Sequence, residues 1–179
     1  MSKEQVLDLL PEINEISDEQ LRNKVIACWE EAIAYRNWTN EELRSIPFTL
    51  LADNVQIHFI EHVRTCCRMA IAVDNVQEQM YGSRRVPVNR DYLVAGSLLA
   101  DVGKLFEYDK KEDGTIYKSD YGKNLRHPFS GVGLAFKHGL PPEVMHIIAV
   151  HSKEGAGEKR SPEALIFHHV DFIDFELVK

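Results

Sequence analysis

Helical periodicity is the feature of this sequence that most restricts its fold. Apolar residues recur at intervals of three and four between residues 18 and 37, and again between about residues 53 and 79. This spacing is typical of the buried stripe of an amphipathic helix. Further helical segments follow to the end of the chain, and no segment requires a β-sheet. We therefore predict an all-α fold, a helical bundle with an N-terminal helical extension.

Capping residues predict where the first helices begin. Ser17 or Asp18 can cap the helix that runs to about residue 37, and Thr39 with Glu42 has the spacing of a capping box. The capping box predicts a short helix that ends near Pro47. The next helix is long and is expected to begin at about Asp53 or Asn54, so that His58 and His62 both lie on it.

Capping and turn residues also mark the element boundaries in the second half of the chain. Asn89 can cap a helix over residues 89–108, and the dipeptide 113–114 predicts a tight turn within a loop or small hairpin. Helices are then expected over residues 127–137, from Pro141-Pro142 to near His151, and from Pro162 to the end. Asp101 falls inside the predicted helix over residues 89–108.

Length and composition restrict the organisation of the chain. Its 179 residues fit one domain. The formal charge of −7, from 28 acidic and 21 basic residues, argues against a protein that holds nucleic acid by neutralising phosphates. No apolar stretch is long enough to span a membrane, and the N-terminus lacks the pattern of a secretory signal. Three cysteines without metal-site spacing predict reduced core thiols and a cytoplasmic protein.

Asp101 is the most unusual residue in a core helix. It lies in the apolar sequence SLLADVGKL, where an unpaired carboxylate would cost several kcal/mol. One interpretation is structural, with the charge satisfied by a helix cap or by Lys104 one turn later. Similar exceptions occur at Asp171, at His62, and at His127 and His151 near helix ends. Together they favour a functional interpretation of Asp101 over the structural one.

The order of these residues resembles that of a known family. His62 is followed by the motifs LLADVGK, HPFSG, IIAVHS and HHVDFID, in a sequence similar to the HD-domain superfamily of metal-dependent phosphohydrolases, which are all-helical. The later motifs resemble the bacterial branch that hydrolyses diadenosine tetraphosphate symmetrically. The resemblance covers about residues 54–176. It predicts an HD-like metal-binding helical domain over residues 54–179 and leaves residues 1–53 as an N-terminal helical extension.

The resemblance implies a role for each matching residue. His62, Asp101 and Asp171 would bind one metal ion, while His127 and His151 match the added histidines of two-metal members, in which Asp101 would bridge both ions. Imidazole and carboxylate suit Fe, Mn, Ni, Co or Zn, and a bridged pair about 3.5–4 Å apart can activate water for attack on phosphorus. Lys104, on the same predicted helical face as Asp101, could reach a phosphate oxygen.

One position departs from the family pattern. Ala100 stands where the family has the histidine of its His-Asp doublet, so the first metal would lose an imidazole. His58, four residues before His62, and His168, three before Asp171, each share a predicted helix face with a retained ligand and could replace it. Both are also explained as partly exposed polar residues. Without a replacement the site would hold one metal, take a water at the gap, or be inactive.

Three functions remain open from the sequence. The first is a metal-dependent hydrolase of a small soluble phosphate ester or nucleotide anhydride, with Asp101 and Lys104 as its catalytic residues. The second is a di-iron oxygenase that cleaves a C–C or C–P bond, because the same ligand set supports that chemistry in other proteins of this fold. The third is a catalytically inactive binding or regulatory module. The sequence also leaves homo-oligomerisation open.

Overall fold

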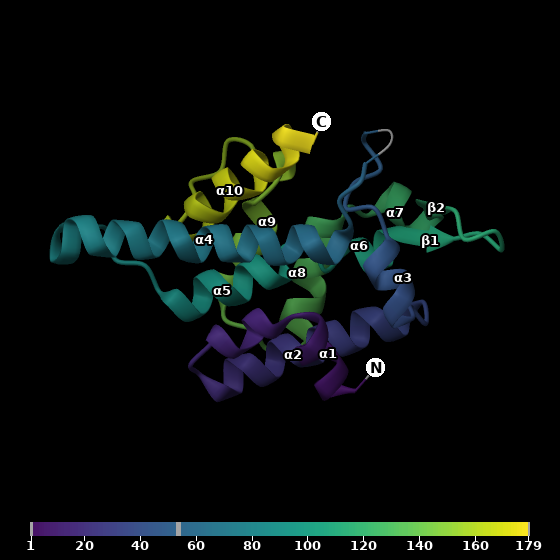
Figure 1. The fold of residues 1–179 in the computed structure, drawn as a ribbon, viewed down its shortest axis with the longest axis horizontal. Helices are drawn as coiled ribbons and strands as arrows, with labels where there is room; N and C mark the ends of the chain where they lie inside the picture. The colour runs from purple at the N-terminus through teal and green to yellow at the C-terminus, as the bar shows by residue number, and fades with distance from the viewer. Residues whose placement is uncertain (1, 53–54, 179) are drawn as a thin grey trace.

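The computed structural model describes residues 2–52 and 55–178, and over these ranges the chain is a helical bundle with one small hairpin (Figure 1). Its elements follow one another along the chain as α1 Lys3–Leu9, η1 Pro11–Glu15, α2 Glu19–Tyr35, α3 Asn40–Ser45, α4 Phe59–Tyr81, η2 Gly82–Arg84, α5 Arg90–Leu99, α6 Lys104–Glu107, β1 Tyr108–Lys110, β2 Ile116–Lys118, α7 Asp120–Asn124, α8 His127–Lys137, α9 Pro142–Val150, η3 Lys153–Gly155 and α10 Pro162–Val178. The all-α prediction is confirmed.

Several helix boundaries lie where the capping residues predicted them. The side chain of Asp18 accepts hydrogen bonds from the first turn of α2, and Thr39 and Glu42 form both bonds of a capping box on α3. Helix α8 begins at His127 and ends at Lys137, and Gly139 follows with a φ of 65°. These ends were predictable because each depends on local hydrogen bonds between neighbouring residues.

The long helix begins later than predicted. Asp53 and Asn54, its expected first residues, lie outside the described part of the chain, but residues 55–58 are described and are not helical. Helix α4 begins at Phe59, whose backbone N–H bonds Ile46 O at 2.8 Å, and His58 pairs with Pro47 as an isolated β-bridge. This pairing with the segment before it holds His58 extended and delays the helix.

The predicted helix over residues 89–108 is two helices. Helix α5 ends at Leu99, α6 begins at Lys104, and Asp101 lies in the turn between them. The turn is closed by i→i−3 hydrogen bonds, with the N–H of Lys104 donating to Asp101 O at 2.9 Å. Gly103 allows α8 to approach closely, because a Cβ at that position would lie 2.2 Å from His127 O. Apolar periodicity continues through the turn, so it did not mark the break.

The predicted loop or small hairpin is a hairpin. Strands β1 and β2 pair antiparallel, with Tyr108 opposite Lys118, and project from one end of the bundle (Figure 1). Gly114 at the tip has a φ of 83°, a conformation that glycine adopts without a steric penalty. The polar turn dipeptide was therefore a reliable signal here.

The N-terminal helices share their core with the rest of the bundle. The indole N–H of the buried Trp29 donates to Leu98 O at 3.2 Å, and its ring lies 5.9 Å from that of Phe59. Asp91 accepts hydrogen bonds from the N–H groups of Ser17 and Asp18, so α5 is tied to the start of α2. Helix α1 was not predicted from the sequence. Within the described ranges, no helix is long and apolar enough to cross a lipid bilayer.

Candidate metal centre

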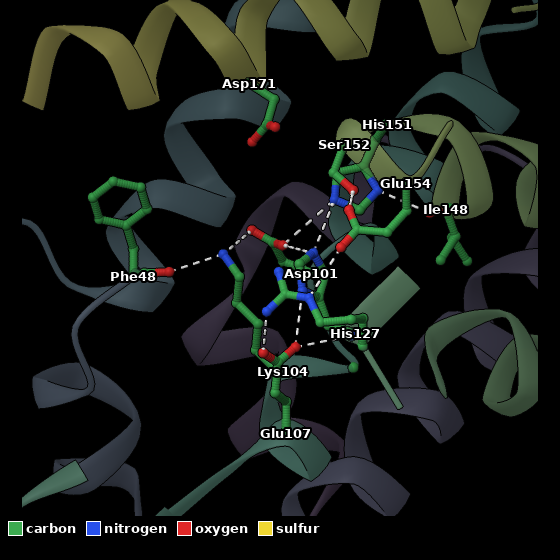
Figure 2. A network of polar contacts seen from close by, with 12 residues as sticks. Phe48, Asp101, Lys104, Glu107, His127, Ile148, His151, Ser152, Glu154 and Asp171 are labelled. Carbon is green, nitrogen blue, oxygen red and sulfur yellow. Dashed lines mark hydrogen bonds and ion pairs between the residues drawn. The ribbon is translucent and has the colours of Figure 1, made fainter. Parts of the chain in front are cut away.

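Five residues predicted as metal ligands come together from five parts of the fold. His62 lies on α4, Asp101 in the turn between α5 and α6, His127 at the first position of α8, His151 directly after α9, and Asp171 on α10. Figure 2 shows four of them, with the Asp101 carboxylate facing the imidazoles of His127 and His151 and with Asp171 above it on α10. The helices thus bring together donors that are more than 100 residues apart in sequence.

The donors form two groups that share Asp101. In the first group, which we call the His62 site, His62 Nε2 lies 3.1 Å from Asp101 Oδ2 and 3.1 Å from Asp171 Oδ1. In the second, the His127 site, His127 Nε2 lies 3.3 Å from His151 Nε2 and 3.3 Å from Asp101 Oδ1, while His151 Nε2 lies 3.6 Å from the same oxygen. One carboxylate therefore offers a different oxygen to each group.

These spacings fit the coordination of a divalent transition metal. Bonds of about 2.0–2.1 Å at tetrahedral angles place neighbouring ligand atoms about 3.3–3.4 Å apart. The distances between donors in both sites lie close to that spacing, and each site has three donors within 4.8 Å of one another. Imidazole nitrogen and carboxylate oxygen are the donors that such ions take in proteins. Both sites could therefore hold a metal ion.

The histidines of the His127 site are oriented by hydrogen bonds on their other nitrogens. His127 Nδ1 lies 3.1 Å from the buried Glu107 Oε2, and His151 Nδ1 lies 2.8 Å from Ile148 O (Figure 2). Glu107 is held in turn by the guanidinium of Arg126 at 2.6 Å and by the N–H of His127. Such partners fix the ring orientation and leave Nε2 free for a metal.

His62 has a corresponding partner that the sequence reasoning missed. Asp174 Oδ2 lies 2.6 Å from His62 Nδ1, opposite the nitrogen that faces Asp101 and Asp171. Cys66 Sγ lies 3.6 Å from the same Nδ1, and burial raises the pKa of this thiol to about 11, so that it is protonated and neutral. A signal for Asp174 was present, since it follows Asp171 by three residues and shares its helix face.

Lys104 lies beside the shared carboxylate. Its Nζ is 2.8 Å from Asp101 Oδ2 and 2.8 Å from Phe48 O, and the side chain is buried (Figure 2). The predicted proximity of Lys104 and Asp101 is therefore present, although through a turn and not along one helix. The structural interpretation of Asp101, a carboxylate paired with this lysine, is also met by the geometry.

Burial and neighbouring charges act together on the ionisation of the site. Burial works against ionisation of Asp101, but Lys104 and hydrogen bonds with His151 and His62 hold its pKa well below the ordinary value. Burial would lower the pKa of His62, yet hydrogen bonds to three carboxylates raise it well above the ordinary value. The pKa of His127 is lowered by burial, which favours the neutral imidazole that binds metals.

Phe48 covers the His62 site. Its ring lies 4.5 Å from the His62 imidazole at an interplanar angle of 32°, and 6.1 Å from the ring of Phe175 on α10. Phe48 is itself 1% exposed, and His62 is 2% exposed. The extended pairing that delays α4 thus places an apolar side chain over the donors, where it limits the access of water.

The structure does not bring the two proposed replacement histidines into these sites. His58 precedes α4, lies 3.2 Å from Glu61 Oε2 and is 41% exposed at its side chain, so the prediction that it shares a helix face with His62 is wrong. His168 Nδ1 instead lies 2.5 Å from the backbone O of His151. Ala100 itself is fully buried in an apolar cluster with Ile147 and Phe167.

The fold and the site together define a class of protein: a helical bundle that carries a buried histidine–aspartate centre suited to divalent metals. The chain belongs to the HD domain family, whose sequence profile matches residues 55–175. This match confirms the resemblance at the level of the family.

A curated relative extends the comparison. Over 168 residues the chain is 33% identical to dihydroneopterin 2',3'-cyclic phosphate phosphodiesterase from Methanocaldococcus jannaschii. The alignment covers 91% of this chain but 66% of the relative, which is therefore a longer protein. No solved structure matches the chain significantly.

The Asp174 contact gives a first testable prediction. Replacing Asp174 with Asn removes the charge that orients His62. Co²⁺ binding at the His62 site should therefore weaken about 10–100-fold, the usual effect of losing such a partner. Calorimetric titration of the metal-stripped chain measures the change. Asp120→Asn is the matched control, because Asp120 is exposed, pairs with Lys123 and belongs to neither group of metal donors. Equal affinities in the wild-type chain and the Asp174 variant would contradict the orienting role.

Proposed function

We propose that this chain is a metal-dependent phosphohydrolase that acts on a small soluble phosphate ester or nucleotide anhydride. The observation that carries the proposal is the position of Asp101, whose two carboxylate oxygens each face a separate group of metal donors. A carboxylate shared in this way is the arrangement expected of a bridged two-metal hydrolase. Fe, Mn, Ni, Co and Zn are the candidate ions.

The proposed ligand set follows the two sites. His62, Asp101 and Asp171 would hold one ion, and Asp101, His127 and His151 the other. When bound, such ions supply Lewis acidity and make water a stronger nucleophile at neutral pH. Oxygen atoms of a phosphate group would complete the coordination that three protein donors leave open.

The other residues of the centre act on charge, orientation and water. Lys104 would stabilise negative charge that builds on phosphoryl oxygens, since its ammonium lies 2.8 Å from the shared carboxylate. Glu107 and Asp174 act as positioning residues for His127 and His62. Phe48 would exclude bulk water from the reacting group, so that these charges act in a less polar medium.

The substrate class is proposed from similarity. The relative from Methanocaldococcus jannaschii is named for a 2',3'-cyclic phosphate, a strained diester of two neighbouring hydroxyls. We therefore propose a phosphodiester of a small heterocyclic alcohol as the first substrate to test. Diadenosine tetraphosphate is the second, because the later motifs resemble that branch of the family.

Metal-dependent turnover is the experiment that tests this function. The metal-stripped chain is incubated with Mn²⁺, Fe²⁺, Co²⁺, Ni²⁺ or Zn²⁺ and with nucleoside 2',3'-cyclic phosphates, diadenosine tetraphosphate and simple phosphomonoesters. We expect hydrolysis of at least one substrate that requires added metal and stops with chelator. Failure to hydrolyse any of them with any ion would overturn the proposal. Iron-dependent oxygen uptake without hydrolysis would instead support the oxygenase interpretation.

A further inference from the structure

We infer that the two cation sites bind with unequal strength, with the His127 site holding the resident ion and the His62 site an exchangeable one. This inference rests on the proposed function and deepens it by assigning an order of filling. The pattern of the family, in which the His-Asp doublet completes the first site, gives no reason to expect this order. The order comes from Ala100 and from the contacts around each group of donors.

The His127 site has every donor that the family pattern gives it, and hydrogen bonds already hold these donors in place. It offers two imidazoles and a carboxylate, the composition of several catalytic zinc sites, with donor atoms 3.3–3.6 Å apart. Glu107 and Ile148 O fix both rings through Nδ1, so little conformational freedom is lost when an ion binds. The imidazoles are 1–7% exposed at their side chains, which also slows exchange with solvent.

The His62 site has three donors but lacks the additional histidine that the family pattern gives it. Ala100 contributes only a methyl group, which lies in an apolar cluster that also holds Ile147 and Val150. Within the described ranges, the groups of three donors that include Asp101 are those of the His62 and His127 sites alone, so neither His58 nor His168 supplies a fourth donor. A cation here is left with one imidazole and two carboxylates.

Lys104 further weakens the His62 site. Its ammonium lies 2.8 Å from Asp101 Oδ2, the same oxygen that faces His62 Nε2. The ammonium occupies part of the coordinating capacity of this oxygen and repels a cation at the His62 site, and an ion already bound at the His127 site adds its own repulsion. Asp171, the third donor, is 13% exposed at its side chain, more than either histidine of the other site. The missing histidine, the Lys104 ammonium and the exposure of Asp171 each make the ion at the His62 site easier to lose.

The test is a Co²⁺ titration of the metal-stripped chain by calorimetry, together with metal analysis after desalting. We expect two binding events whose dissociation constants differ by at least about tenfold, and about one ion retained per chain after desalting. His127→Ala should remove the tight event and the retained ion, whereas His62→Ala should remove the weak event and keep the retained ion. His169→Ala, which removes an exposed imidazole of α10, is the matched control.

Each outcome decides the inference separately from the enzymatic activity. Two equal events, no retained ion, or loss of the retained ion in His62→Ala but not in His127→Ala would each overturn it. The expected binding pattern without phosphate release would leave the inference standing and count against the proposed function. Hydrolysis by a chain with two equal sites would support the function and reject the order of filling.

Discussion

Asp101→Asn should abolish metal-dependent hydrolysis, with a loss of at least about 10³-fold in turnover. The amide keeps the size of the side chain but removes the charge and one of the two oxygens that face the donor groups. It also leaves the buried ammonium of Lys104 without its anionic partner. Both metal sites should therefore weaken together, a result that no other single ligand replacement is expected to give. Turnover and metal content of the same preparation measure the two effects.

Asp120→Asn provides the comparison for this prediction, since it makes the same chemical change at an exposed carboxylate that pairs with Lys123. Circular dichroism establishes whether the Asp101 variant remains folded, because breaking a buried ion pair on one side costs roughly 3–5 kcal/mol. A folded Asp101 variant that keeps wild-type turnover would reject the bridging role. That result would favour the purely structural interpretation, in which Lys104 and Asp101 form only a buried pair.

The sequence identified the five residues that converge at the centre, but not the packing that brings them together. His62, Asp101 and Asp171 were recognisable because a charged or polar residue in an apolar helix is costly unless it has partners. His127 and His151, near helix ends, were recognisable from the motifs of the family. Their convergence follows from packing among helices, which residue spacing does not encode. The resemblance to the HD domain superfamily supplied that missing information.

The residues that the sequence reasoning missed act through other side chains. Glu107 and Asp174 contact the outer nitrogens of two histidines. Glu107 has no spacing that distinguishes it from a solvated acidic residue, whereas Asp174 could have been found from its position three residues after Asp171. The interpretation of His58 failed for a related reason. It assumed a helix through residue 58, whereas pairing between Phe59 and Ile46 keeps that segment extended. Contacts between distant segments therefore decided each of these positions.

The turn that carries Asp101 leads to a second large effect. Gly103→Ala should destabilise the chain by about 3 kcal/mol or more, since the added Cβ would lie 2.2 Å from His127 O and 2.6 Å from Ser130 Oγ. The first of these atoms belongs to the backbone and cannot move without shifting the start of α8. His127 would then be displaced from Asp101, so metal retention should fall along with the midpoint of unfolding. Chemical denaturation and metal analysis measure the two quantities.

Gly133→Ala is the matched control, because it makes the same substitution on α8 where a Cβ meets no atom within 4 Å. Alanine in an exposed helical position should stabilise the chain by about 0.5–1 kcal/mol. The two variants therefore separate the general effect of replacing glycine with alanine from the effect of the close approach that only Gly103 requires. If Gly103→Ala were as stable as Gly133→Ala and retained its metal, the tight contact between this turn and α8 would not be what holds His127 against Asp101.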